Sequence, residues 1–201
     1  MAVVSIKNKL RRGNLLVGNT AYDPAAMDSI ATVTVGSGGS SYIEFTSIPN
    51  TYTHLQIRYL ARTNRATYGV ESFKINVGVS SADTGANYTR HYLLGDGSSV
   101  AAAADTSATY WEGVNDFGTT TGGSFGAGVI DILDYANTNK YKTVRYITGF
   151  DSNDGNRDRI TIASGLWQSS SAITSITLEA DASQTLSQYT TLALYGIKAA
   201  A

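Results

Sequence analysis

Apolar and polar residues alternate along most of this chain, and this alternation is the feature that most restricts its fold. It is clearest in HLQIRYLAR at 54–62 and in SFKINVGV at 72–79. The apolar residues that share one side of these stretches are Leu55, Ile57, Tyr59, Ala61, Phe73, Ile75, Val77 and Val79. Because successive side chains of a strand point to opposite faces, the pattern predicts strands with one face buried and the other in water.

Further stretches of this kind follow at short spacing, separated by segments rich in Gly, Asn and Ser. They lie at 29–35, 40–46, 88–94, 109–115, 127–135, 142–150, 158–164, 173–180 and 191–197. Roughly ten or eleven short strands with such turns predict an all-β fold, an antiparallel β-sandwich of jelly-roll-like form. The GSGGS segment at 36–40 is expected to join its neighbouring strands as a hairpin. Helical character is expected only in short segments, at 5–12, at 98–105 and in the turn at 136–141.

The composition excludes several classes of function. With 15 basic and 16 acidic residues, the net charge of −1 argues against a nucleic-acid binder, which needs a basic excess to neutralise phosphates. No window approaches the roughly twenty apolar residues of a membrane-spanning helix, so no membrane association is expected. Cysteine is absent, which removes disulfides, thiolate metal sites and a cysteine nucleophile.

Candidate catalytic residues are few, and each has a simpler structural interpretation. The two histidines, His54 and His91, are expected on the surface, and no nucleophile elbow of the form G-x-S-x-G accompanies them. The carboxylate-rich segment 151–158 lacks the ligand spacing of a calcium loop and is expected to form a turn. Asp131 and Asp134 are expected to lie at the end of a strand or to cap it. We therefore expect no catalytic residue, no metal and no cofactor.

The aromatic residues offer a second functional interpretation. Tyr110, Trp111 and Trp167 could stack on sugar rings, but aromatic side chains also fill the cores of β-sandwiches. Buried tryptophans would favour a structural protein, whereas exposed tryptophans beside carboxylates would favour one that binds or degrades polysaccharide.

The first 24 residues differ in character from the rest of the chain. Lys7, Lys9, Arg11 and Arg12 precede the first acid, Asp23, and the interleaved apolar runs are too short for a secretory signal. We expect an N-terminal docking arm at 1–24, extended and ordered by a partner, and a β-sandwich domain at 25–201. The alternatives are a solvated tail and a segment packed on its own body.

Docking by the arm would use two short elements. Ile6 and Leu10 would share one face of a helical turn, and 15–17 would form a strand able to extend a partner's sheet edge. The residues expected to dock are Ile6, Lys7, Leu10, Arg11, Arg12, Leu15, Leu16 and Val17.

Six segments in this order resemble a family of tailed-bacteriophage virion proteins, described as tail-fibre or minor structural proteins. They are NLLVGNTAYDP, TSIPNTYTHLQIR, HYLLGDGSS, IDILDYANTNKYKTVR, GLWQSSSAITSITL and LALYGIK. The resemblance implies a non-enzymatic structural protein of the virion, assembled in the bacterial cytoplasm. It would sit on the fibre, the collar or the head surface, as a capsid decoration in the last case. No catalytic residue comes with the resemblance.

The implied partners are other virion proteins of the tail, collar or capsid, bound through the arm. Uncovered sheet edges in a sandwich also predict a homo-oligomer, and the resemblance to phage appendages suggests a trimer. The alternative function is a polysaccharide-binding or polysaccharide-degrading appendage, with a host surface glycan as its ligand.

Overall fold

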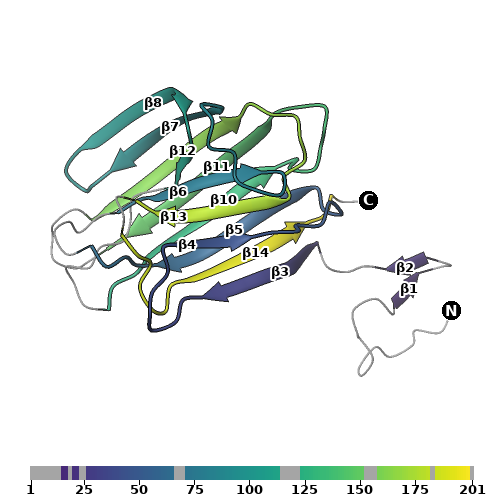
Figure 1. Ribbon diagram of the computed structural model, residues 1–201, viewed down its shortest axis with the longest axis horizontal. Coiled ribbons are helices and arrows are strands. Elements are labelled where there is room, and N and C mark those ends of the chain that lie inside the picture. Colours follow the sequence, from purple (N-terminus) through teal and green to yellow (C-terminus); the bar gives the residue numbers. More distant parts are fainter. Residues whose placement is uncertain are drawn as a thin grey trace.

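The computed structural model describes residues 15–17, 20–22, 26–65, 71–113, 123–151, 158–181 and 184–199 (Figure 1). These residues form an all-β structure in which two antiparallel sheets pack as a sandwich. The expected fold class is therefore confirmed.

The larger sheet has eight strands and the smaller one has four. In spatial order, the larger sheet consists of β3 (Met27–Thr34), β14 (Thr191–Ile197), β5 (His54–Ala61), β10 (Gly126–Leu133), β11 (Lys142–Phe150), β12 (Arg159–Trp167), β7 (Tyr88–Gly95) and β8 (Val100–Ala108). The smaller sheet consists of β4 (Tyr42–Phe45), β13 (Ser175–Ala180), β6 (Phe73–Gly78) and β9 (Trp111–Gly113). A separate two-stranded sheet pairs β1 (Leu15–Val17) with β2 (Thr20–Tyr22).

The core lies between the two sheets, where the apolar side of the alternating stretches is buried. The wet face expected at 72–79 is wrong, because Asn76 and Gly78 of β6 are buried too. Leu55, Ile57, Tyr59 and Ala61 of β5 are buried, and so are Phe73, Ile75 and Val77 of β6. Val79 follows the end of β6 and is about half exposed at 52%, so its expected inward position is wrong. Two edge-to-face aromatic pairs cross the core, Tyr59 with Phe73 and Tyr88 with Trp111.

The hairpin expected at 36–40 is wrong. Residues before this segment form β3 of the larger sheet, and residues after it form β4 of the smaller sheet. β3 pairs with β14 and β4 pairs with β13, so the connection passes from one sheet to the other. Val35 is buried at this crossing. A glycine-rich turn specifies a reversal of the chain, but burial of the flanking strands decides which partners they take.

The helical segment expected at 98–105 is also wrong, whereas the turn expected at 136–141 is present. Residues 100–108 form β8, whose backbone pairs with β7 at the end of the larger sheet. The preference of alanine for helix is a weak local term that pairing with a sheet edge overrides. Residues 136–141 form turns before β11. The segment 5–12 lies outside the described residues, and of the arm at 1–24 only β1 and β2 are described.

Candidate functional site

The outer face of the larger sheet, the face turned away from the smaller sheet, carries an extended apolar surface. Ten large apolar side chains of the described structure are exposed, and six of them lie on this face. These six are Leu60, Leu93, Val100, Ile147, Ile160 and Ile162, with exposed fractions from 49% to 72%. Contiguous apolar surface of this kind is typical of a binding site rather than of free solvent-facing sheet.

Strand pairing arranges the outer face in three rows that cross β5, β10, β11, β12, β7 and β8 in that order. Row one is Leu60, Ala127, Gly149, Ile160, Gly95 and Val100. Row two is Arg58, Val129, Ile147, Ile162, Leu93 and Ala102. Row three is Gln56, Asp131, Arg145, Ser164, His91 and Ala104. Rows one and two are apolar apart from Arg58, and row three is mainly polar.

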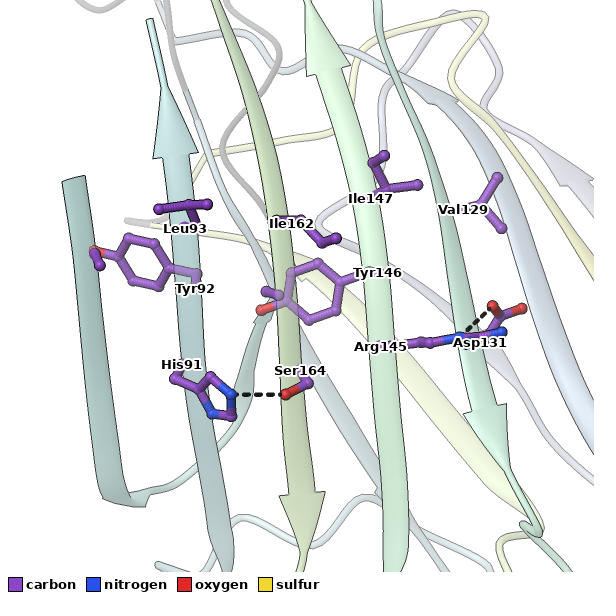
Figure 2. Close-up of a pocket in the computed structure, with 12 residues that line it drawn as sticks. His91, Tyr92, Leu93, Val129, Asp131, Arg145, Tyr146, Ile147, Ile162 and Ser164 are labelled. Atoms are coloured by element: carbon purple, nitrogen blue, oxygen red, sulfur yellow. Dashed lines mark hydrogen bonds and ion pairs between the residues drawn. The ribbon is translucent and has the colours of Figure 1, made fainter. Parts of the chain in front are cut away.

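A groove of about 740 Å³ runs along rows two and three. Figure 2 shows Leu93, Ile162, Ile147 and Val129 in line across the strands, with the polar side chains of row three beside them. The hollow continues around Ile160 in row one. Gly149 and Gly95 flank Ile160 in that row. Because neither has a side chain, the side chain of Ile160 projects beyond the surface of its row neighbours.

The orientation of β12 shows that the apolar outer face is not a by-product of core packing. Its inward positions hold Thr161 and Ala163, both buried, whereas its outward positions hold Ile160 and Ile162. In the first half of this strand the larger apolar side chains therefore point away from the core, whereas Trp167 at its end points inward. Full burial of an isoleucine side chain is favourable by about 1.5–3 kcal/mol. Because Ile160 and Ile162 are 57% and 55% exposed, a partner that covers this face would gain roughly half of that at each position.

The polar groups of row three largely satisfy one another. Asp131 accepts a hydrogen bond from Gln56 Nε2 at 2.8 Å. It accepts a second one from Arg145 Nε at 3.1 Å, which Figure 2 shows. Arg58 Nε in turn donates to Gln56 Oε1 at 2.8 Å. Ser164 Oγ and His91 Nε2 lie 3.1 Å apart within hydrogen-bonding distance. Row three thus borders the apolar groove with side chains that are already paired.

This arrangement does not resemble an acid–base or nucleophilic centre. A triad requires a carboxylate that orients the histidine toward a hydroxyl, but Asp131 is bound to Arg145 and Gln56 instead. Asp134 lies in the turn after β10, where it pairs with Lys140 and lies 3.6 Å from His54. The two aspartates therefore belong to separate ion pairs, one on the outer face and one in the turn after β10.

Other sequence-derived candidates resolve as structural residues. Trp111 and Trp167 are both buried, the outcome that favours a structural protein over a sugar-binding one. His54 accepts a hydrogen bond from the backbone of Asp134 at 2.9 Å, so it joins the start of β5 to the turn after β10. Within the described ranges, no group of three or more metal-ligating side chains occurs, and no helix is long and apolar enough to cross a membrane.

The residues expected to dock a partner lie mostly beyond what the structure describes. Ile6, Lys7, Leu10, Arg11 and Arg12 are outside the described residues. Leu15, Leu16 and Val17 form β1, which pairs with β2 of the same chain through Leu15↔Tyr22, Leu16↔Ala21 and Val17↔Thr20. The expected strand at 15–17 is present, while its role in docking stays a prediction.

Sequence reasoning missed the outer face, although a signal was present. Several strands of the larger sheet carry apolar residues at both odd and even positions, and so on both faces, as in RITIASGLW at 159–167. A strand with one wet face should not do this, so such a run predicts coverage on both sides. The outer side chains Ile147 and Ile162 follow that rule, and no part of the described chain covers them.

Comparisons of this chain with protein-family models, with curated proteins and with solved structures find no match.

Proposed function

We propose that this protein is a non-enzymatic structural component of a tailed-bacteriophage particle. It would reside in the virion and be held there by other proteins of the tail, collar or capsid. The observation that carries the proposal is the apolar outer face, which exposes Leu93, Ile147, Ile160 and Ile162 together. A surface of this kind is stabilised by burial against protein, which is the condition of a subunit inside an assembly.

The sequence resemblance supports the same class of function. The segment IDILDYANTNKYKTVR spans the end of β10, the turn and the start of β11, and LALYGIK lies in β14 and just beyond it. β10 and β11 are interior strands of the larger sheet, and β14 lies beside its edge strand β3. These two segments therefore include strands of the larger sheet as well as the turn between β10 and β11.

The lining of the groove favours a protein ligand over a glycan. Sugar sites use aromatic faces for stacking and unpaired polar groups for hydroxyls. Here the groove is floored by aliphatic side chains, and its polar groups are engaged with one another. Tyr92 and Tyr146 contribute to the groove, but Tyr146 is buried and its hydroxyl donates to the backbone oxygen of Glu112.

Two attachment modes fit this function. The arm at 1–24 would join the protein to another virion component, with the residues around Leu15–Val17 as its apolar anchor. The β-sandwich would self-associate as a homo-oligomer, since β8 exposes an edge without proline or lysine from Val100 to Ala104.

Purification of the particle tests the proposal. Particles of the phage that encodes this chain would be banded on a density gradient, and its peptides would be quantified by mass spectrometry. We expect a constant ratio to the major capsid protein across the band. Recovery of the chain only among unassembled soluble proteins, or loss of host polysaccharide caused by the purified protein, would contradict the proposal.

A further inference from the structure

We propose that a second copy of this chain covers the outer face of the larger sheet, related to the first by a two-fold axis that runs along the strands between β11 and β12. The inference rests on the proposed role as an assembly component. It names the occupant of the apolar face and the symmetry of the contact.

The position of the two-fold axis follows from the requirement that each of the three rows lies over a suitable row of the second copy. In a contact between two identical faces, every residue must meet a side chain of its own surface under one rotation. An axis along the strands between β11 and β12 places each row over the same row of the partner. β11 then lies over the partner's β12, β10 over its β7, and β5 over its β8.

Under this rotation the apolar rows meet each other. In row two, Ile147 lies opposite Ile162 of the partner subunit, and Val129 lies opposite Leu93 of the partner subunit. In row one, the raised Ile160 lies opposite Gly149 of the partner subunit, where the absent side chain leaves room for it. A Cβ added at Gly149 would lie 3.8 Å from its nearest neighbour, so this position is open rather than filled from within.

Row three of one copy lies opposite row three of the partner subunit, and no two like charges face each other there. Asp131 lies opposite His91 of the partner subunit, whose second ring nitrogen can donate a hydrogen bond to a carboxylate. Arg145, whose side chain is 67% exposed, lies opposite Ser164 of the partner subunit. Arg58 lies opposite Ala102 of the partner subunit. Each charged side chain of the face therefore lies opposite either a group that can form a hydrogen bond with it or a small neutral side chain.

The alternative in-plane axis, at right angles to the strands, fails this test. It would place row one over row three, so that Ile160 would meet Ser164 and Gly149 would meet Arg145 of the other copy. Apolar side chains would then desolvate charged groups without pairing them. Of these two axes, the one along the strands places the apolar row one over row one and the polar row three over row three. This match of the face with itself points to a second copy rather than to an unrelated protein.

The size and geometry of the face also suit a dimer. Six adjacent strands span about 24 Å at the usual strand spacing. With three rows, this area can form the apolar centre of a standard protein interface, surrounded by a polar rim. Two sheets that face each other with parallel strands fall in the aligned class of β-sandwich packing, in which the strand directions stay within about 30° of each other.

The test compares charged variants on and off the face. Ile162→Arg introduces a buried charge beside the axis, and Val79→Arg is the matched control, because Val79 is 52% exposed and lies away from the face. We expect light scattering to give the mass of two chains for the unchanged protein and for Val79→Arg, and of one chain for Ile162→Arg. A circular dichroism spectrum equal to that of the unchanged protein would show that Ile162→Arg is folded.

A cross-linking experiment tests the position of the axis. The chain has no native cysteine, so Ile147→Cys supplies a single thiol that lies next to its own copy across the axis. A short bismaleimide should convert this variant to covalent dimers, and Val79→Cys should stay uncross-linked. His91→Asp, which would face Asp131 of the partner subunit, should weaken association by at least about tenfold, and adding Asp131→Asn should restore it.

The outcomes separate this inference from the proposed function. A monomer at all concentrations would overturn the two-fold contact, as would an oligomer of any size that Ile162→Arg leaves intact. A monomer found in the particle would overturn this contact only. A dimer that never enters a particle would overturn the virion role and leave the contact standing.

Discussion

Trp167 donates its indole N–H to Oδ2 of Asp83 at 2.8 Å, which ties the connection between β6 and β7 to the last residue of β12. The same connection is held from its other side, because the hydroxyl of Tyr88 and the amide of Asn76 both donate to the backbone oxygen of Asp83. Asp83 therefore joins the two sheets at one end of the sandwich through side-chain and backbone contacts.

We expect the loss of this carboxylate to lower stability and to flatten its dependence on pH. Burial opposes ionisation of Asp83, but hydrogen bonds from Trp167, Gly85 and Asn87 outweigh it and lower its pKa. The unfolded chain then binds a proton more readily, so the stabilisation is full above a pH of about 4 and is lost as pH falls through the folded pKa. Asp83→Asn should cost about 1–3 kcal/mol at neutral pH. Urea unfolding between neutral and acidic pH should show a shallower slope for the variant, and an unchanged slope would contradict this assignment.

Lys142 provides a second test, because its ammonium group is buried at the end of the sandwich. Its Nζ donates to the backbone oxygens of Asn137, Lys140 and Ser170 at 2.6, 2.8 and 3.1 Å. Lys142→Met would leave these acceptors unpaired, so we expect a loss of about 2–4 kcal/mol in the free energy of unfolding. Lys140→Met is the control: its side chain is exposed and its ion pair with Asp134 should contribute less than about 1 kcal/mol. Equal effects of the two substitutions would argue against a structural role for Lys142.

Glycine positions in the larger sheet should differ sharply in their tolerance of a methyl group. A Cβ on Gly165 would lie 2.6 Å from the backbone oxygen of Thr89 and 2.8 Å from the ring of Trp111. Gly165→Ala should therefore lower the free energy of unfolding by about 1–3 kcal/mol. Gly149→Ala, where the space is open, should change it by less than about 1 kcal/mol. Thermal unfolding of both variants would check this, and a tolerated Gly165→Ala would show that Trp111 packs differently.

The arm should act through its apolar residues more than through its charges. Leu16→Asp is expected to abolish incorporation into particles, because buried apolar anchors supply most of the binding free energy of an interface. Lys7→Ala combined with Arg11→Ala should only weaken incorporation, and more so at high salt. Quantification of the variants in purified particles measures both effects. Normal incorporation of a chain that lacks residues 1–19 would place the attachment surface elsewhere.

The core of this fold could be predicted from sequence because it depends on a local pattern. Leu55, Ile57 and Tyr59 lie inward, as the period of two requires, and so do Phe73 and Ile75. The burial of the tryptophans follows from the same preference of aromatic residues for sandwich interiors. In β5 and β6, the existence of the strand and the choice of its inward side are thus set by residues close in sequence.

Pairing between distant segments could not be predicted in this way. The chain crosses between sheets after Val35 because β3 and β4 find partners in β14 and β13, well over a hundred residues further along. The alanine-rich segment at 101–104 becomes a strand because β7 offers it a free edge. Neither the crossing between sheets nor the pairing with β7 is indicated by the residues of the segment itself.

The outer face illustrates a third limit of sequence reasoning. In β12 the better core formers, Ile160 and Ile162, point outward, while Thr161 and Ala163 point inward. A pattern of alternating polarity alone would assign this strand to the opposite orientation. The burial of Thr161 beside outward isoleucines is consistent with a strand that is covered on both faces, by the core on one side and by a second interface on the other.

A reconstruction of the phage particle by electron cryomicroscopy tests the central claim most directly. We expect density for this β-sandwich at a fixed position on the tail, collar or head, with the outer face around Ile147 and Ile162 buried against protein. A particle without such density, or one in which the sandwich is present but this face is open to solvent, would contradict the proposed role.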